Sequence, residues 1–460
     1  MYNEYSEFNR QTTGTLNVFS FVGEQAKPIT GAKVSVMDVN GNLITTLQTD
    51  KSGQTQKVKL PAPKKSLSLS PVGVIPYAKY NVKVESEGHV TSEIKGVQIF
   101  ADTESTQPVP LTELGQIRNR QIQEITISDH ALLDKVPKLS EEQIQKEVIQ
   151  EIVFVSFHLL DLPRIPSHVV VHDGHPNDDS APKYRVAFKD YIINVACSEI
   201  YPTWPTESIK ANVTCIVSFT LNRIYTELYL GKGKNFTISS STAFDHKYIH
   251  NRNIYSTISN VVNNLFDKYI SFSDSSPYVP FLAQYCDGKK VKCPNWLSQW
   301  GSKYLADSGK DCIQILKHYY GPKVKLFEAP KAEGSPESFP GHNLQIGSKG
   351  KHVTAIQQYI NRISQNYPAI GKIEVDGSFG PATQKAIKKF QAIFNLPQTG
   401  IVDHGTWYKV SDIYVAVMKF AEGIPPRESR YTSTPFRNVH SLNEEYTYTP
   451  YGTWTPMGYL

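Results

Sequence analysis

One acidic residue of this sequence stands where a general acid would be useful. Glu199 comes after an apolar run, residues 191–196, that is predicted as a strand, and it precedes a rigid Pro-Thr-Trp-Pro turn at 202–205. A helix is predicted next, because Pro205 suits a first helical turn and Glu207 favours the positive helix N-terminus. A carboxyl group in such a place can lose solvent, which raises its pKa toward the range that a general acid needs near neutral pH. An ordinary loop carboxylate explains the same local pattern.

Two separated motifs resemble the SpoIID/LytB-like lytic transglycosylases. Segment 198–212, Ser-Glu-Ile-Tyr-Pro-Thr-Trp-Pro-Thr-Glu-Ser-Ile-Lys-Ala-Asn, is similar to the catalytic signature of that family. Segments 297–302, Leu-Ser-Gln-Trp-Gly-Ser, and 315–321, Ile-Leu-Lys-His-Tyr-Tyr-Gly, are similar to the turn and the helix end that close the family's domain. The resemblance covers residues 167–328. It implies that Glu199 is the catalytic residue and that the substrate is the glycan of peptidoglycan.

The resemblance also implies a set of substrate-binding residues. They are Lys210, Ser240, Thr242, Asp245, Tyr248, Ser298 and Gln299. Lys210, the basic residue of the predicted helix, would bind glycan or tune the acid, although a solvated lysine on the wet face explains it equally well. The Ser/Thr-rich stretch 238–245 would hydrogen-bond sugar hydroxyls or the peptide stem, but an Asx-type turn explains the same residues.

Two departures from the family pattern keep other functions open. Val217 stands where many relatives carry an arginine, and His246 stands where they usually carry a glutamine. These departures favour a wall-binding protein without catalysis, whereas Glu199 and the Ser-Gln-Trp-Gly turn oppose it. If Asp245 lies across a cleft from Glu199, the pair would suit an ordinary muramidase, since most glycosidases use two carboxylates.

Composition sets further limits. The chain has 460 residues, enough for two to four domains, and 40% of them are hydrophobic. The formal charge of +5 is small for this length and gives no reason to expect a nucleic-acid partner. Residues 1–20 lack the pattern of a signal peptide, and no apolar run is long enough to span a membrane. The resemblance implies a spore protein, deposited in the cortex and coat region without an ordinary secretion signal.

The cysteines give a weak signal for metal or disulfides. There are five of them, Cys197, Cys215, Cys286, Cys293 and Cys312, and this odd, sparse set argues against a disulfide framework. The first two lie in apolar runs and are predicted to be buried. For the pair 286 and 293, a local disulfide, free thiols and zinc all stay open. No metal and no cofactor is predicted, because neither a His-Glu-x-x-His motif nor paired Cys-x-x-Cys motifs occur.

The N-terminal part has the pattern of a β-protein. Strand-like runs at 16–21, 32–36, 80–84 and 96–100 are separated by turn residues, and Asn40-Gly41 between two such runs predicts a hairpin. The stretch resembles transthyretin-like or carboxypeptidase-regulatory-like sandwiches. A folding aid, a binding module and a pro-domain are all open, and we favour a pro-domain.

A polar linker follows, with a capped helix predicted from Ser140 to about Leu160. The resemblance implies that the protein is a zymogen and that a partner, a Csp-like protease, cleaves this linker.

The C-terminal part resembles a peptidoglycan-binding domain built from a twofold helical repeat. Val353, Ile356, Ile360 and Ile363 lie at helical spacing, and Asp376-Gly377 predicts a turn before the next helix. Most of these residues are expected in the core rather than against a ligand. The last residues lack periodicity and are rich in Tyr, Thr and Pro, which predicts a disordered or surface-wrapping tail.

Together these observations predict a multidomain α+β protein. Its expected parts are an N-terminus (1–12), a β-sandwich (13–112), a linker (113–166), a SpoIID-like catalytic domain (167–328), a second linker (329–341), a three-helix peptidoglycan-binding domain (342–415) and a tail (416–460). The expected activity is cleavage of the MurNAc–GlcNAc β-1,4 bond of spore cortex during germination, giving 1,6-anhydromuramoyl ends. One acid suffices for this reaction, because the attacking hydroxyl already belongs to the substrate.

Overall fold

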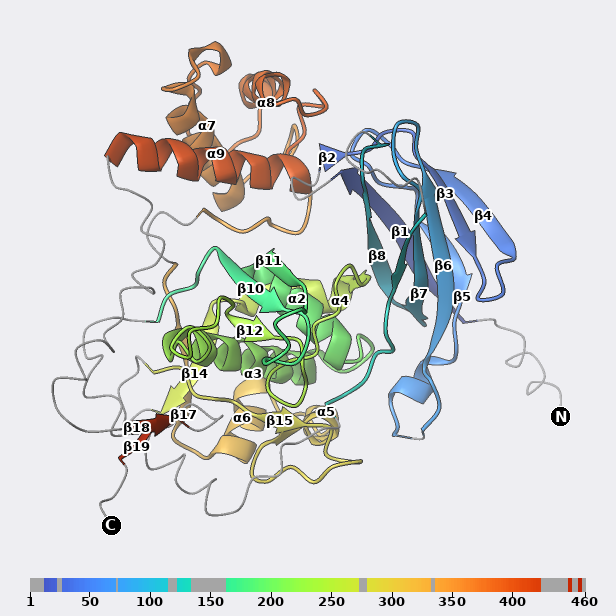
Figure 1. Cartoon of the computed structure of the whole chain (residues 1–460), viewed down its shortest axis with the longest axis vertical. Helices are drawn as coiled ribbons and strands as arrows, with labels where there is room; N and C mark the ends of the chain where they lie inside the picture. The colour runs from blue at the N-terminus through green and yellow to red at the C-terminus, as the bar shows by residue number, and fades with distance from the viewer. Residues whose placement is uncertain are drawn as a thin grey trace.

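The computed structural model describes residues 12–22, 27–71, 73–114, 122–133, 163–272, 279–331, 336–422, 446–448 and 454–456. Two β-sheets form the N-terminal part, an α+β part follows, and helices form the C-terminal part (Figure 1). The helix predicted over 140–160 lies outside the described residues. Among the described helices, none combines the length and the apolar character that crossing a membrane requires.

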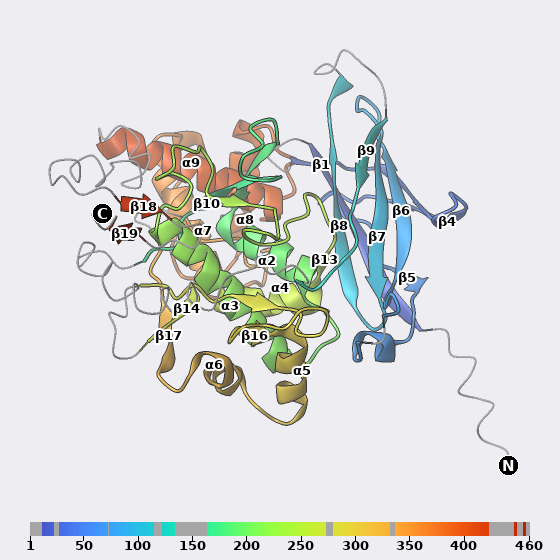
Figure 2. The same cartoon turned by 60° about the horizontal axis from the view of Figure 1, so that its bottom comes forward.

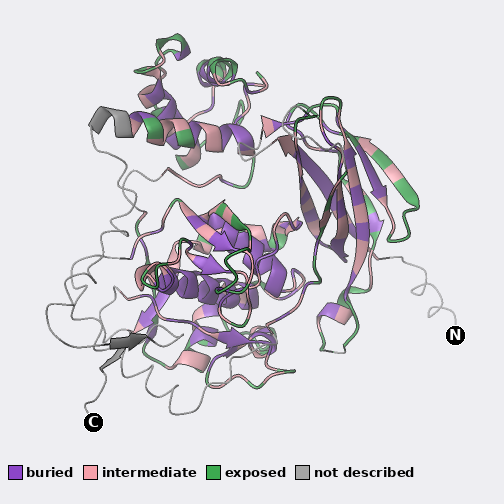
Figure 3. Ribbon diagram, viewed as in Figure 1, coloured by how far each residue is buried: buried purple, intermediate pink, exposed green. Residues whose placement is uncertain are grey.

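The N-terminal part is a pair of five-stranded sheets. One sheet contains β1 (Thr13–Val22), β2 (Lys27–Pro28), β5 (Val58–Pro61) and β8 (Glu104–Leu111), and its fifth strand, β13 (Ile254–Tyr255), comes from the central part. The other contains β3 (Lys33–Met37), β4 (Leu43–Gln48), β6 (Tyr77–Glu85), β7 (Ser92–Phe100) and β9 (Gln123–Thr126). Alternate side chains of both sheets meet in one apolar core, among them Leu16, Val34 and Val82. Figure 3 shows buried residues along most strands of both sheets and exposed residues along β4.

The hairpin predicted at Asn40-Gly41 joins β3 to β4. The Asp38 carboxylate accepts hydrogen bonds from the backbone N–H groups of Asn40 and Asn42, both at 2.9 Å. Gly41 has a φ of 86°, which favours glycine. Of the runs predicted as strands in this part, 16–21, 80–84 and 96–100 lie within observed strands, and 32–36 overlaps β3, which begins at Lys33. Half-buried strands of a sandwich alternate in the way the sequence does.

The sheets reach beyond the predicted boundary at residue 112. Strand β9, from the predicted linker, pairs in parallel with β7, and β13 (Ile254–Tyr255), from the central part, pairs antiparallel with β8. Beside this junction the buried Asn253 side chain donates to the Gln98 carbonyl (2.7 Å) and accepts from the Gln98 N–H (3.4 Å). Main-chain hydrogen bonds therefore join the sandwich to the central part.

Replacing Asn253 with leucine is expected to destabilise this junction. The substitution leaves the buried backbone groups of Gln98 without their partner, which costs about 2 kcal/mol of unfolding free energy. Chemical denaturation of the full chain measures the loss, and Asn264→Ala, at an exposed position of a nearby helix, is the control. Equal stability of the two variants would show that the junction contributes nothing.

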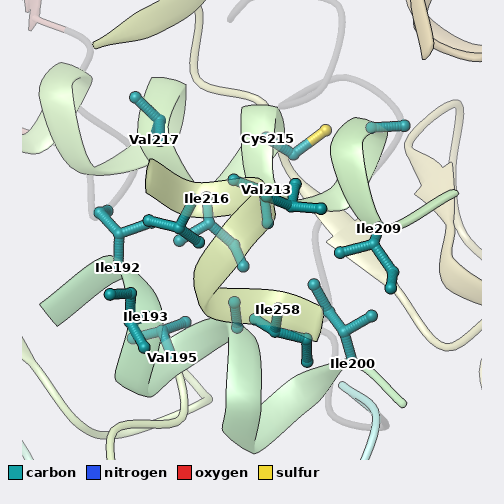
Figure 4. Close-up of a cluster of buried hydrophobic side chains, with 14 of the residues drawn as sticks. Ile192, Ile193, Val195, Ile200, Ile209, Val213, Cys215, Ile216, Val217 and Ile258 are labelled. Atoms are coloured by element: carbon teal, nitrogen blue, oxygen red, sulfur yellow. The ribbon is translucent and has the colours of Figure 1, made fainter. Parts of the chain in front are cut away.

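The central part packs its helices around one long buried helix. Its helices are α2 (Phe188–Glu199), α3 (Thr206–Tyr225), α4 (Ser256–Leu265), α5 (Gln299–Asp307) and α6 (Cys312–Tyr320). Its remaining strands are β10 (His168–His172), β11 (Lys183–Ala187), β12 (Ile238–Ser239), β14 (Lys268–Phe272), β15 (Tyr285–Cys286), β16 (Leu297–Ser298) and β17 (Val324–Glu328). Figure 4 shows apolar side chains of α2, α3 and α4 meeting in the core.

The strand predicted at 191–196 is wrong, because these residues belong to helix α2. Ile192, Ile193 and Val195 all lie in the core, so the helix is buried on several sides. A helix buried in this way gives a continuous apolar run without a helical period, and such a run cannot be told from a buried strand by pattern alone. Helix α3, in contrast, lies where the helix after the Pro-Thr-Trp-Pro turn was predicted.

The C-terminal part consists of α7 (Lys351–Ser364), α8 (Pro381–Ile393) and α9 (His404–Glu422), with the short 3-10 helix η3 (Pro368–Ile370) between the first two. Two glutamines on successive helices hold the following turns in the same way. Gln357 accepts from the N–H of Gly377 (2.9 Å), and Gln391 accepts from the N–H of Gly400 (2.8 Å). The same glutamine-to-glycine contact thus occurs in both halves of the predicted twofold repeat.

Helix α9 continues to Glu422, past the predicted end of this domain at 415. Within the predicted tail, β18 (Tyr446–Tyr448) pairs with β19 (Trp454–Pro456). The prediction for the other tail residues falls outside the described residues.

The C-terminal part docks on the central part. The Tyr408 hydroxyl donates to Asp190 of helix α2 (2.9 Å), and the neighbouring Lys189 ammonium donates to the carbonyl of Phe339. Figure 2, turned from the first view, again shows the sheets on one side of the helices α2 to α4 and the C-terminal helices over them. The three parts are therefore joined by contacts in this structure, which we call the closed chain.

Candidate active site

Glu199 is the last residue of helix α2 and is completely buried. Its carboxyl group accepts hydrogen bonds from the Lys247 backbone N–H and the Tyr285 hydroxyl, both at 2.5 Å. Burial raises the pKa of this carboxyl to about 7, and the bonds from Tyr285 and Lys247 lower the pKa by less. A carboxyl with this pKa exists in both protonation states at neutral pH, as an acid–base catalyst requires.

The chain around Glu199 is held in place by aromatic and amide contacts. Ile200 is extended and ends the helix, and the Trp204 indole donates to the Ser68 carbonyl (2.8 Å) of the 3-10 helix η1 (Lys65–Ser68). Trp204 also packs against Trp300, with ring centres 5.0 Å apart. The Gln299 side chain donates to the Glu199 carbonyl (3.0 Å) and so fixes the main chain of the acid.

Replacing Glu199 with glutamine is expected to change how stability depends on pH. The folded chain holds the proton of Glu199 up to a pKa of about 7, whereas the unfolded chain loses it near 4.5, so wild-type stability falls as pH rises between these values. The loss approaches about 3 kcal/mol, and glutamine avoids it. Thermal unfolding at pH 5 and pH 8 should therefore show that the stability of the variant, relative to that of the wild type, is higher at pH 8 than at pH 5. Glu87→Gln, at an exposed acid, is the control, and equal pH profiles would contradict the assignment.

Residues 128–133, which we call the cover segment, lie over the site. The segment bonds to the main chain on both sides of Glu199, through Ala131 N–H to the Ser198 carbonyl (3.3 Å) and His130 Nε2 to the Ile200 carbonyl (3.0 Å). The His130 ring also stacks on Tyr201, with ring centres 4.8 Å apart. Burial lowers the pKa of His130, so its imidazole is neutral at physiological pH. This part of the predicted linker therefore packs against the main chain around Glu199 instead of merely connecting two domains.

A cavity of about 430 Å³ lies beside the cover segment. Three of the predicted binding residues line it, Ser240, Thr242 and Tyr248, together with Lys247, whose N–H bonds to Glu199. A smaller cavity of about 30 Å³ is lined by Thr242, Leu133 of the cover segment and Tyr285, which bonds to Glu199. These three predicted residues are therefore brought together near the acid.

Asp245, which was predicted to bind sugar or to act as a second acid, lies in a buried ion pair. Its carboxylate accepts from Arg223 Nε (2.9 Å), the Tyr229 hydroxyl (2.5 Å) and the Ser239 N–H (2.9 Å), and its side chain is completely buried. Both oxygens are thus engaged inside the protein. Asp245 is a buried ion-pair partner, and it also lines the smaller cavity with Thr242 and Tyr285.

Two other predicted binding residues also make structural contacts. Lys210 pairs with Glu207 on the same helix (2.7 Å), and that pair lies at a partly exposed position. The Ser298 hydroxyl accepts from the Gly301 N–H (2.9 Å) and caps the start of α5. Gln299, the remaining one, lies at the site but contacts the main chain of Glu199.

The two departures from the family pattern have structural explanations. Val217 is completely buried in the apolar core, where an arginine would have no counter-charge among the side chains of that cluster. His246 is buried and shares a hydrogen bond with the Tyr191 hydroxyl (3.1 Å). Burial and the charge of Arg223 lower the pKa of His246 to about 3, so it is a neutral hydrogen-bonding group, as glutamine is. Neither departure from the family pattern therefore removes a group that holds the Glu199 carboxyl.

Sequence reasoning missed Tyr285 and the Lys247 N–H as partners of Glu199. Tyr285 precedes Cys286, which forms a disulfide with Cys293, and this bridge closes the loop next to the site. A tyrosine beside one of two closely spaced cysteines was the available signal. Cys197 and Cys215 are buried free thiols, which confirms that prediction. Among the residues that the structure describes, no three His, Cys, Asp or Glu side chains gather as metal ligands would.

Comparison with known proteins identifies the C-terminal part. Residues 349–410 match the family described as a putative peptidoglycan binding domain. The chain is 37% identical over 68 residues to the zinc D-Ala-D-Ala carboxypeptidase of Streptomyces albus G, which covers 15% of this chain and 25% of that protein. The chain thus spans about a quarter of the length of this curated relative. Residues 349–410 of the chain therefore carry a peptidoglycan-binding domain.

Solved structures show only local similarity. The minor pilin GBS52 of Streptococcus agalactiae has a TM-score of 0.17 and 16% identity, covering 23% of this chain and 46% of the pilin. Catechol 1,2-dioxygenase of Acinetobacter sp. ADP1 has a TM-score of 0.17 and 18% identity, covering 25% of this chain and 59% of the dioxygenase.

Proposed function

We propose that the protein is a peptidoglycan lytic transglycosylase that uses Glu199 as its acid and base. The observation that carries the proposal is the buried Glu199 carboxyl, with a pKa of about 7, held by Tyr285 and Lys247 beside a cavity of about 430 Å³. The resemblance of segments 198–212 and 297–302 to the SpoIID/LytB-like family supports the same assignment.

In the proposed reaction, protonated Glu199 donates its proton to the glycosidic oxygen between MurNAc and GlcNAc as the C1–O bond breaks. The muramoyl C6 hydroxyl then attacks C1 of the same sugar, and its proton returns to the Glu199 carboxylate. The products are a 1,6-anhydromuramoyl end and a free GlcNAc 4-hydroxyl, without consumption of water. Because the nucleophile is already on the substrate, a second carboxylate is unnecessary, in agreement with the buried ion pair of Asp245.

The other parts of the chain fit a zymogen that acts on the wall. The peptidoglycan-binding domain would raise the local concentration of glycan around the catalytic part. The cover segment keeps the closed chain inactive, and a partner protease of the Csp-like class would cut within 134–162. In this proposal the protein resembles the clostridial spore cortex-lytic enzyme SleC, and it acts on cortex glycan in the spore during germination.

A catalytically inactive wall-binding protein is the second candidate, and one observation favours it. Glu199 is fully buried under the cover segment, so in the closed chain the glycan has no access to it. After the site is opened, a zymogen would become active, whereas a wall-binding protein would remain inactive.

Mass spectrometry of muropeptides separates these functions. Purified cortex sacculi are incubated with the chain after cleavage within 134–162, in wild-type and Glu199→Gln forms. Anhydromuramoyl ends that appear only with the wild type support the transglycosylase. Reducing muramoyl ends would show hydrolysis instead. If no muropeptides are released, the wall-binding protein is the remaining candidate.

A further inference from the structure

The cover segment presents one residue to the site in a specific way. The Leu133 N–H donates to Gln299 Oε1 (2.8 Å), and the Leu133 carbonyl accepts from the Asp287 N–H (2.7 Å). The two partners come from different elements, the start of α5 and the disulfide-closed loop that follows β15. An acceptor and a donor on the protein therefore face one N–Cα–C=O unit.

Neither partner can reverse its role. The Gln299 amide nitrogen donates to the Glu199 carbonyl (3.0 Å), which leaves the amide oxygen as an acceptor toward the cover segment. The Asp287 N–H is held by a tight loop, in which the Asp287 carboxylate accepts from the N–H groups of Lys289 (3.1 Å) and Val291 (3.0 Å). The disulfide between Cys286 and Cys293 closes the same loop. The pair is thus a preformed subsite for a ligand N–H and a ligand oxygen.

Sugars of peptidoglycan carry the matching groups. In a 2-acetamido sugar the amide nitrogen on C2 and the oxygen on C3 are vicinal, so they form the unit N–C–C–O, as the backbone of Leu133 does. The N–H is a donor, and the C3 oxygen is an acceptor whether it is a hydroxyl in GlcNAc or an ether in MurNAc. A single amide group would fit less well, because its N–H and C=O point in opposite directions.

We propose that the cover segment imitates a 2-acetamido sugar, and that Gln299 Oε1 and the Asp287 N–H bind the amide N–H and the C3 oxygen of that sugar. The inference rests on the proposed function and adds its glycan subsite. The same Gln299 amide touches both the cover segment and the main chain of Glu199, so the bound group lies next to the acid. A sugar at the bond that is cut occupies such a place, whereas a peptide stem branches away from it.

Competition binding on the full chain tests the proposal. Residues 128–133 are replaced by Gly-Ser repeats, which opens the site and leaves the sandwich attached through β13 and β8. The probes are N,N′,N″-triacetylchitotriose and a fluorescent peptide with the sequence of residues 126–136, Thr-Ile-Ser-Asp-His-Ala-Leu-Leu-Asp-Lys-Val. We expect the trisaccharide to displace the peptide. N-methylation of the peptide at Leu133 should weaken its binding by at least about tenfold, whereas methylation at Leu132 should weaken it less.

Two further variants complete the experiment. Gln299→Met should weaken both ligands, whereas Lys317→Ala, at an exposed position of helix α6, should keep both. If the replaced chain does not fold, the milder pair His130→Gly and Leu133→Pro removes the bond to the Ile200 carbonyl and the N–H that Gln299 accepts. Simultaneous binding of trisaccharide and peptide would overturn the proposal, as would displacement of the peptide by a free stem peptide but not by the trisaccharide. The readout is binding, so failure of glycan cleavage is a separate result.

Discussion

Glu199→Gln is expected to lower the rate of glycan cleavage by the opened protein by about a thousandfold, the middle of the range for loss of a general acid. Glutamine keeps the shape of the side chain and can still accept the Lys247 N–H, but it has no proton to give. The rate of muropeptide release measures the effect, and binding of the protein to sacculi should stay unchanged, because the peptidoglycan-binding domain is separate from this site.

Glu227 supplies a matched control for this prediction. Burial raises the pKa of its carboxyl to about 7 as well, but it lies beyond the end of helix α3, whereas the Glu199 carboxyl bonds to Lys247 and Tyr285, which line the two cavities. Glu227→Gln should therefore cleave glycan at nearly the wild-type rate. A similar loss in both variants would show that a raised pKa alone, and not the place of Glu199, accounts for the effect. A Glu199→Gln protein with full activity would leave the catalytic assignment without support.

Opening the site is expected to have the next largest effect. The full chain should release few muropeptides, and a chain cut within 134–162 and freed of its N-terminal part should be at least about tenfold more active. If the closed form makes up about 99% of the population, the gain approaches a hundredfold. The physical reason is that the cover segment occupies the hydrogen-bonding groups on both sides of Glu199.

The uncut chain with residues 128–133 replaced by Gly-Ser repeats tells which part inhibits. If the cover segment alone blocks the site, this chain is active without cutting. If it stays inactive while the cut protein is active, the docked sandwich is the inhibitor. Equal activity of the full and cut wild-type chains would contradict the zymogen proposal altogether.

Local patterns predicted much of the fold. The sandwich strands and the helices of the peptidoglycan-binding domain each bury one face, and a half-buried element shows its period in the sequence. Helix α3 is buried on nearly all sides, and its start was indicated by Pro205 and Glu207. Helix α2 could not be predicted in this way, because its apolar residues face several neighbours at once. Strand β13 is only two residues long, and its partner β8 lies far away in the chain, so nothing local indicates the pairing.

Only those residues of the candidate site that belong to a recognisable sequence motif could be predicted. Glu199 and Gln299 were found through the resemblance of their segments to a family. The role of Asp245 depended on Arg223, which lies on another element, and a charge pair between distant residues leaves no local pattern. The cover segment has the composition of a linker, and its function comes from contacts with main-chain groups, which no side-chain pattern encodes.

The pairing of β13 with β8 has a consequence for the time course of activation. Cutting the chain removes a covalent bond, but the N-terminal sandwich remains held by strand pairing and by the buried bonds between Asn253 and Gln98. Dissociation then becomes a step of its own, which breaks several bonds together. Activity should consequently appear after a lag whose length depends on temperature and not on the amount of protease, and Asn253→Leu should shorten it. The proposed zymogen would thus delay cleavage of the wall glycan for a set time after the protease has cut the chain.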